Sequence, residues 1–213
     1  MPRMMTSADT HISIKNVTKK FGHTRAIDNL SLHLSQNRVY LLVGPNGSGK
    51  TTLIKCIMGL LRYEGTIIKS TTRIGYAPDR YIMPPYLNVV DFLESMGRVK
   101  EQSRMHCRDY IDHHLTLFEL DNVRYRPIGA LSSGMRQKVN LLQAMIHVPK
   151  ILILDEPLKG LDGPAEDHFM KILSAKTKEM MLIISTHYPE RFRMRGKRLI
   201  HLENGHLCED SDV

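Results

Sequence analysis

The sequence lacks an apolar run that is long enough to cross a membrane. Its longest apolar stretches are Val39–Val43, Ile151–Leu154 and Met180–Ile184, whereas a membrane-spanning helix needs roughly 18 to 20 residues. The N-terminal stretch MPRMMTSADT also lacks the apolar segment of a secretory signal peptide. We therefore expect a cytoplasmic chain that does not cross a membrane by itself.

Cysteine is scarce, and the chain has no internal repeat. Its 3 cysteines, Cys56, Cys107 and Cys208, show no Cys-x-x-Cys spacing. An odd number of scattered cysteines argues against a disulfide framework in a cytoplasmic protein. We expect all of them to be reduced thiols.

What the chain has in excess is positive charge. Its 213 residues include 30 Lys+Arg against 22 Asp+Glu, which gives a net charge of +8. A hydrophobic share of 42% and a charged share of 24% are ordinary for a globular domain and exclude a disordered chain. Five positive charges without an acidic neighbour lie within residues 191–198: Arg191, Arg193, Arg195, Lys197 and Arg198. Such a run fits nucleic acid, an anionic lipid surface or a solvated face, and charge alone does not separate these alternatives.

Hydrophobic periodicity predicts strands and helices in the order typical of an α/β fold. Strands are expected around Ile12–Val17 and at Ala26–Leu34, Arg38–Gly44, Gly65–Lys69, Arg73–Ala77, Ile151–Asp155 and Met180–Thr186. A helix is expected from Leu53 to Leu61, where apolar residues recur at helical spacing. The pair Asn204-Gly205 predicts a hairpin with a type I′ turn. We expect both ends of the chain, about ten residues each, to be poorly ordered.

A helical segment interrupts this pattern in the middle of the chain. From Asn88 to about Val123 the apolar residues recur at helical spacing without a strand candidate between them, and prolines precede and follow the segment. We predict one domain over residues 11–209, with a core of about 11–83 and 130–209 and an inserted helical subdomain of about 84–129. The N-terminal strands would form an antiparallel β portion of the core.

A glycine-rich loop follows the strand Arg38–Gly44. The sequence GPNGSGKT matches the phosphate-binding P-loop, in which Gly and four further residues precede Gly-Lys-Ser/Thr. Backbone N–H groups of such a loop point at one phosphate cluster, and the next helix adds the positive end of its dipole. Lys50 is expected to reach the β- and γ-phosphates and Thr51 to bind Mg²⁺. The fold class is therefore α/β with a P-loop NTPase (RecA-like) core. The predicted nucleotide-binding residues of the loop are Gly44, Pro45, Asn46, Gly47, Ser48, Gly49, Lys50, Thr51 and Thr52.

A second element is needed, because kinases, GTPases and transport ATPases all have a P-loop. In Ile151–Glu156 four apolar residues form a strand that ends in two acids. Asp155 is placed to hold Mg²⁺ through its water shell. Glu156 is placed to polarise an attacking water as general base. The alternative is a core strand that ends in solvated acids.

Between these elements the chain resembles the ATP-binding cassette (ABC) family. The family signature LSGGQ stands here as LSSGM, and the run LLQAMIHVPKILILDEPLKGLD matches the block from the signature to the D-loop. Ser and Gly at a helix N-terminus make a second anion site. The resemblance implies that Ser132, Ser133 and Gly134 face the γ-phosphate of an ATP held by another subunit. Taken alone, the heptapeptide could also be a helix N-cap formed by Ser132 or Ser133.

The resemblance implies roles for three further side chains. His187, after the strand Leu182–Thr186, matches the switch histidine that contacts the γ-phosphate and steadies the attacking water. Asp162 matches the D-loop aspartate at the dimer interface. Phe21 stands where the family stacks an aromatic ring on adenine, although Phe21 could also be a core residue.

The chain departs from the family pattern at several positions. The Q-loop glutamine is replaced by Asp79, which we expect to hold Mg²⁺ or its water while still coupling the core to the helical subdomain. Leu158-Lys159 replaces the common Thr-Ser before the D-loop. Ser133 replaces a glycine of the signature and Met135 its glutamine, and Met135 resembles exporter subgroups whose permease is a separate chain.

The function implied by the resemblance is that of an ATP-hydrolysing subunit of an exporter-type ABC transporter. Its cofactors would be ATP and Mg²⁺, and its catalytic residues Lys50, Glu156 and His187. It would act as a homodimer, or as a heterodimer with a similar ATPase, on an integral-membrane permease at the inner face of the cell membrane, and no nucleic acid is expected. The alternative is a soluble ABC ATPase that acts on nucleic acid or ribosomes. Repair ATPases of that kind have a long coiled coil after the P-loop, and ribosomal ones have two cassettes; neither is found here.

Overall fold

The computed structural model describes residues 10–99, 104–176, 179–194 and 196–212. The chain divides into two compact units, residues 1–72 with 177–213 and residues 73–176. These bounds differ from those of the predicted core and helical subdomain, which stay a prediction.

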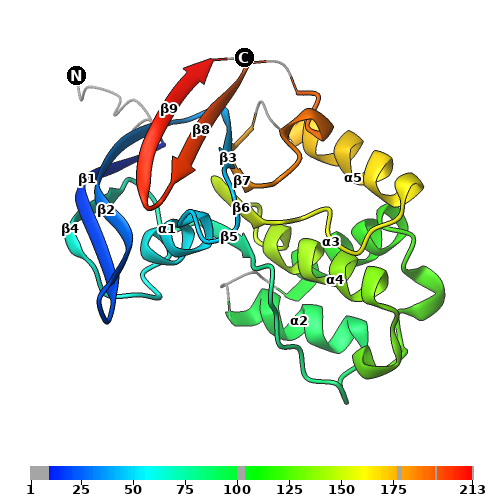
Figure 1. The fold of residues 1–213 in the computed structure, drawn as a ribbon. Helices are drawn as coiled ribbons and strands as arrows, with labels where there is room; N and C mark the ends of the chain where they lie inside the picture. Colours follow the sequence, from blue (N-terminus) through cyan, green and yellow to red (C-terminus); the bar gives the residue numbers. More distant parts are fainter. Residues whose placement is uncertain (1–9, 100–103, 177–178, 195, 213) are drawn as a thin grey trace, which may run out of the picture. The chain divides into compact units, whose positions relative to one another are not determined.

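The first unit contains an antiparallel sheet of three strands in the order β2-β1-β4 (Figure 1). The strands are β1 (His11–Phe21), β2 (Thr24–Ser35) and β4 (Glu64–Lys69). On β2 the side chains of Leu30, Leu32 and Leu34 are buried, whereas the residues between them are exposed. This period of two follows the pleat of a strand with one face in the core. The predicted antiparallel β portion is confirmed.

The same unit contains strands in the order β7-β3-β8-β9. Strands β3 (Val39–Val43), β7 (Met181–Ser185) and β8 (Lys197–Glu203) are parallel, and β9 (His206–Asp212) is antiparallel to β8. Helix α1 (Lys50–Ile57) follows β3 and contacts β2, and a short 3₁₀ helix, Pro189–Arg191, follows β7. The continuous apolar runs of β3 and β7 suit buried parallel strands.

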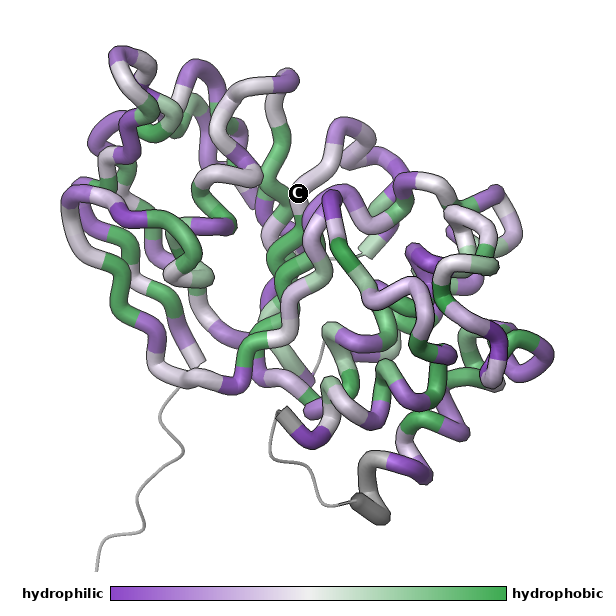
Figure 2. Tube along the Cα trace, turned by 90° about the horizontal axis from the view of Figure 1, so that it is seen from below, coloured by the Kyte–Doolittle hydropathy of each residue, from purple (hydrophilic) through white to green (hydrophobic). Residues whose placement is uncertain are grey.

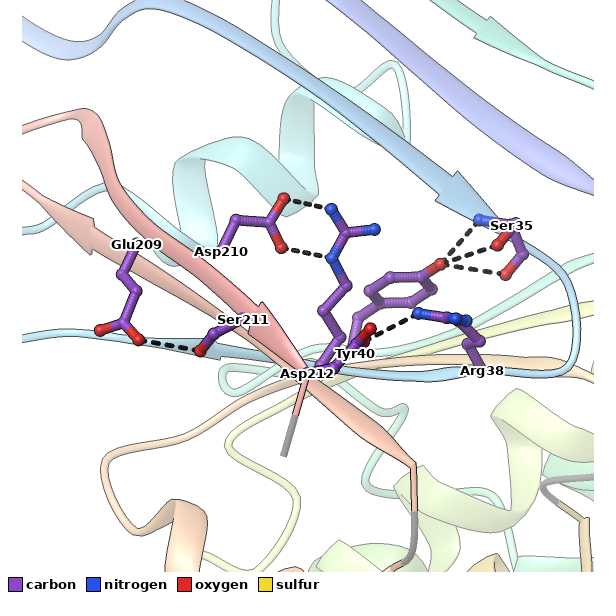
Figure 3. Close-up of polar contacts among 8 residues, drawn as sticks. Ser35, Arg38, Tyr40, Glu209, Asp210, Ser211 and Asp212 are labelled. Atoms are coloured by element: carbon purple, nitrogen blue, oxygen red, sulfur yellow. Dashed lines mark hydrogen bonds and ion pairs between the residues drawn. The ribbon is translucent and has the colours of Figure 1, made fainter.

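The hairpin of β8 and β9 confirms the predicted turn and corrects one expectation. Asn204 and Gly205 both have positive φ, 50° and 81°, as a type I′ turn requires. The C-terminal residues are ordered in β9 up to Asp212, so the expectation of a poorly ordered C-terminus is wrong; residues 1–9 lie outside the described residues. Ion pairs hold the strand in place: Arg198 pairs with Asp210, and Arg38 with Asp212 at 2.8 Å (Figure 3).

Contacts within the chain also change the interpretation of the basic run at residues 191–198. Besides the Arg198 pair, the Lys197 ammonium donates to the backbone oxygen of Phe192 at 2.9 Å. The Arg191 guanidinium lies 5.0 Å from the centre of the Tyr188 ring. The charges of Arg191, Lys197 and Arg198 therefore make contacts within the chain. The described part of the run is thus not one uniform surface patch for an anionic partner, and Arg195 lies outside the described residues.

The second unit combines two parallel strands with helices (Figure 1). Strands β5 (Ile74–Ala77) and β6 (Ile151–Asp155) pair directly. The helices are α2 (Val89–Val99), α3 (Arg104–Leu117), α4 (Ser133–Met145) and α5 (Gly163–Lys176), with short 3₁₀ helices at Asp121–Val123 and Ile128–Ala130. Along the helices hydrophobic and hydrophilic residues alternate (Figure 2), as expected of helices with one buried face. The predicted helical segment is confirmed over its described residues; residues 100–103 lie outside them.

Strand β5 passes so close to helix α4 that one position tolerates only glycine. A Cβ added to Gly75 would lie 2.0 Å from the backbone oxygen of Ala144. We expect Gly75→Ala to lower the free energy of unfolding by about 3 kcal/mol, because the backbone of α4 or β5 must move. Equilibrium urea unfolding would measure this loss. Gly163→Ala is the matched control: no atom lies within 4 Å of its added Cβ, so its effect should stay within about 0.5 kcal/mol. A loss of less than 1 kcal/mol for Gly75→Ala would contradict the close contact.

Candidate functional site

The predicted site residues fall in both units. In the first unit the chain leaves β3 at Val43 and enters α1 at Lys50, as the P-loop pattern predicts. Gly49 is the N-cap of α1 with φ of 108°, a conformation that a side chain would strain. The first turn of α1 contains no acidic residue. The positive end of this helix is thus available to an anion.

The Lys50 side chain curls back over the loop that precedes it. Its ammonium donates to the backbone oxygens of Gly44 at 2.7 Å and Pro45 at 2.9 Å. The residue is 7% exposed, so the charge lies inside the loop. A buried cation held by carbonyls next to a helix N-terminus is suited to bind phosphate oxygens, and the loop therefore fits a nucleotide.

His187 lies beside this loop. Strands β3 and β7 are parallel neighbours, so both carboxyl ends lie at the same edge of the sheet. The pKa of His187 is lowered by desolvation and by the nearby Lys50 charge, although a hydrogen bond to the Gly44 backbone opposes the shift. The imidazole therefore favours its neutral form. The structure brings His187, Gly44 and Lys50 together, which periodicity alone did not reveal.

Phe21 ends β1 and is 49% exposed, so the alternative of a core residue is wrong. The Lys19 ammonium lies 4.7 Å from the ring centre, a cation–π contact. An exposed aromatic face suits stacking on a base. Adenine binding by Phe21 stays a prediction.

In the second unit the two predicted acids lie at the end of β6. Asp155 is 1% exposed. Glu156 has φ of 50°, a left-handed conformation that costs a residue with a side chain about 1 kcal/mol or more. Burial raises the pKa of Tyr76, and the negative charges of Asp155 and Asp79 raise it further. The alternative of solvated acids does not hold for Asp155, and Glu156 carries the backbone strain that often marks functional residues.

The signature segment begins helix α4. Ser132 is its N-cap, and its hydroxyl accepts a hydrogen bond from the Met135 backbone N–H at 3.2 Å. Ser133 is the first helical residue and is exposed. A Cβ added to Gly134 would lie 2.9 Å from the Gly160 oxygen. The capping interpretation is therefore confirmed for Ser132, and it is compatible with an anion site at the same helix end.

Asp162 also caps a helix. Its Oδ1 accepts a hydrogen bond from the Ala165 N–H at 2.9 Å at the start of α5. This contact fixes the loop after β6. A role of Asp162 at a dimer interface stays a prediction.

Asp79 has a partner that the sequence did not reveal. Its Oδ1 lies 2.6 Å from the ammonium of Lys159, another position at which the chain departs from the family pattern. Both residues line a cavity of about 420 Å³ together with Ser133 and Gln137. Asp79 as a ligand of Mg²⁺ stays a prediction, and its carboxylate already faces a cation of this chain.

Helix α4 contributes three amide side chains that the sequence analysis missed. Gln137, Asn140 and Gln143 donate to backbone oxygens of Pro157, Pro78 and Tyr76 at 2.9, 3.0 and 2.8 Å. Their spacing of three residues places them on one face of the helix. That spacing of amides was the available signal. These three hydrogen bonds tie the end of β5 and the loops after β5 and β6 to the signature helix.

The sequence of this chain is similar to those of known proteins. The family model described as ABC transporter matches residues 27–159. An uncharacterized ABC transporter ATP-binding protein, YxlF of Bacillus subtilis, is 31% identical over 203 residues, which cover 92% of this chain and 69% of that protein. A zinc import ATP-binding protein, ZnuC of Rickettsia conorii, is 30% identical over 202 residues, which cover 92% and 84%.

A solved structure shares the fold. The ATP-binding cassette MJ0796, described as dimeric and bound to ADP and Pi, aligns with a TM-score of 0.85 at 24% identity and covers 94% of this chain and 98% of its own. The α/β cassette fold is thus confirmed. Among the described residues, no helix is long and apolar enough to span a membrane.

Proposed function

Because this chain belongs to the ABC transporter family, we propose the parts that its residues play in ATP hydrolysis coupled to transport. The chain is the ATP-binding subunit of an ABC transporter and an ATPase. The main support for these residue roles is the buried ammonium of Lys50, which is held within the loop at the N-terminus of α1. Phosphate oxygens would replace the two backbone oxygens that now accept its hydrogen bonds.

The remaining roles follow the chemistry of each group. Thr51 and Asp155 are the residues suited to hold Mg²⁺, which when bound neutralises charge on the β- and γ-phosphates. Glu156 accepts a proton from the attacking water. His187, favoured in its neutral form, orients that water and the γ-phosphate by hydrogen bonds. Phe21 stacks on the adenine ring.

The proposed active species is a dimer. Ser132, Ser133 and Gly134 of one subunit contact the γ-phosphate held by the other, with Asp162 at the interface, and the helix end at Ser133 supports this role. The partner subunit is either a second copy or a similar ATPase. ATP hydrolysis by the dimer drives transport through an integral-membrane permease. The dimer therefore lies peripherally on the inner face of the cell membrane.

The comparisons bear on the alternatives differently. The matching family model and the relatives are named for transport or import, and none of those reported is named for nucleic acid or ribosomes. The alternative function on nucleic acid therefore has no support from them. Zinc import proteins are among the relatives, so the exporter-type detail inferred from Met135 has no support either.

The partner can be tested by co-purification. The tagged chain, extracted in mild detergent, is expected to retain a polytopic membrane protein, and the ATPase rate should rise several-fold when both are placed in vesicles. Purified permease-free chain is the control for basal hydrolysis. Salt-dependent binding to duplex DNA or ribosomes, with no membrane protein retained, would contradict the transporter role.

A further inference from the structure

The loops that follow β5 and β6 are held together by strand pairing and by hydrogen bonds to helix α4. Strands β5 and β6 pair in parallel, with Ala77 opposite Leu154, so the two loops leave the sheet side by side. The side-chain amides of α4 donate to the backbone oxygens of Tyr76 at the end of β5, Pro78 after β5 and Pro157 after β6. Asn140 is 1% exposed and Gln137 4%. Buried hydrogen bonds of this kind fix loop backbones firmly.

Two side chains of opposite charge from these loops form an ion pair. Asp79 comes from the loop after β5 and Lys159 from the loop after β6, and their charged atoms are 2.6 Å apart. They stand 80 residues apart in the chain. Where the family pattern has a neutral Gln, this chain has Asp79, and where the pattern has a neutral Ser, this chain has Lys159. The two changes therefore compensate each other in charge. Either side chain alone would add an uncompensated charge at this position, whereas the pair has no net charge.

Lys159 is also tied to Glu156 through the backbone. Its N–H donates to the Glu156 oxygen at 3.2 Å and closes a turn that begins at the strained residue. A left-handed conformation at a residue with a side chain persists only where its surroundings hold it. The ion pair anchors the far end of this turn to the loop after β5. The direction of the Glu156 side chain therefore depends on both ends of the turn.

We propose that Asp79 is a positioning residue that acts through Lys159, and that the Asp79–Lys159 pair holds the turn carrying Glu156 in its reactive conformation. This inference rests on the proposed role of Glu156 in ATP hydrolysis. It assigns Asp79 a task other than binding Mg²⁺. It also gives Lys159 a part in the reaction without contact to the nucleotide.

A double-mutant cycle tests the pair. Asp79→Ala and Lys159→Ala should each lower kcat about three- to fivefold, the range of a partly exposed ion pair. KM for ATP and the Mg²⁺ concentration for half-maximal activity should stay within about twofold. The double variant should be no slower than either single variant, because the second change removes nothing further. The exchanged pair, Asp79→Lys with Lys159→Asp, should recover to within about twofold of the original rate.

Controls separate this inference from the proposed function and from misfolding. Arg98→Ala removes an exposed ion pair with Glu94 on α2, 3.2 Å long, and should leave kcat unchanged. Thermal melting should show that every variant is folded. If the original chain does not hydrolyse ATP, the proposed function fails; if it does and the losses multiply in the double variant, only the inference fails. A higher Mg²⁺ requirement for Asp79→Ala alone would also overturn it in favour of a metal ligand.

A zero-length carbodiimide cross-link provides a readout that does not depend on activity. The reagent joins a carboxylate and an amine in contact as an amide, with loss of water. Mass spectrometry of the nucleotide-free chain should find Asp79 linked to Lys159. The pair of Lys138 and Glu119, 3.2 Å apart, serves as the internal reference. A link at the reference pair without one between Asp79 and Lys159 would overturn the inference.

Discussion

Glu156→Gln is expected to lower the ATPase rate by about 1,000-fold while ATP binding is retained. General-base catalysis typically contributes between about 100- and 10,000-fold, and the amide cannot accept the proton of the attacking water. The substitution keeps the size of the side chain and removes its charge. Steady-state phosphate release at saturating Mg-ATP would measure the loss.

The same variant should accumulate as an ATP-bound dimer. If hydrolysis separates the subunits, a chain that binds ATP without hydrolysing it remains in the dimer. Size-exclusion chromatography with and without Mg-ATP would show the shift. Glu203→Gln, at an exposed position on β8, is the control and should hydrolyse ATP at the original rate.

Two results would count against these assignments. Retention of more than a tenth of the rate by Glu156→Gln would show that another group accepts the proton. A hydrolysis-deficient variant that stays monomeric with Mg-ATP would contradict the ATP-bound dimer. The second result would leave the role of Glu156 intact, so the two hypotheses fail separately.

Much of the fold could be predicted because its elements leave local signals. The apolar run before Gly44, the helical spacing after Lys50 and the Asn204-Gly205 turn each reflect a constraint within a few residues. The end of the chain was predicted wrongly for the opposite reason. Strand β9 is polar, and it is stabilised by ion pairs of Asp210 with Arg198 on the neighbouring strand and of Asp212 with Arg38, which lies 174 residues away in the sequence.

The candidate site shows the same division. The P-loop and the acids of β6 are contiguous motifs, so they could be identified directly. The contact of Asp79 with Lys159 joins positions 80 residues apart and depends on strand pairing that no local pattern encodes. The left-handed conformation of Glu156 was equally invisible, because glycine rather than glutamate is the residue that signals positive φ in a sequence.

Lys50 offers a test on the nucleotide itself. Lys50→Ala is expected to weaken Mg-ATP binding about 100-fold, which corresponds to about 3 kcal/mol. A hydrogen bond to a charged group contributes about 1.5–3 kcal/mol, and one ammonium can bind both the β- and γ-phosphates. Isothermal titration calorimetry would measure the affinity. Lys55→Ala, on the same helix, is the control, because Lys55 lies in the last turn of α1 away from the loop.

The variant should also lose stability before any nucleotide is added. Removing the ammonium leaves the oxygens of Gly44 and Pro45 without the donors that now lie 2.7 and 2.9 Å away, at a cost of about 1–3 kcal/mol. Thermal melting should therefore show a lower midpoint without ATP and a much smaller rise with it. A lower midpoint with a full rise on ATP addition would mean that Lys50 shapes the loop but does not bind phosphate. Because the two contributions are measured separately, the experiment distinguishes a structural lysine from a ligand-binding one.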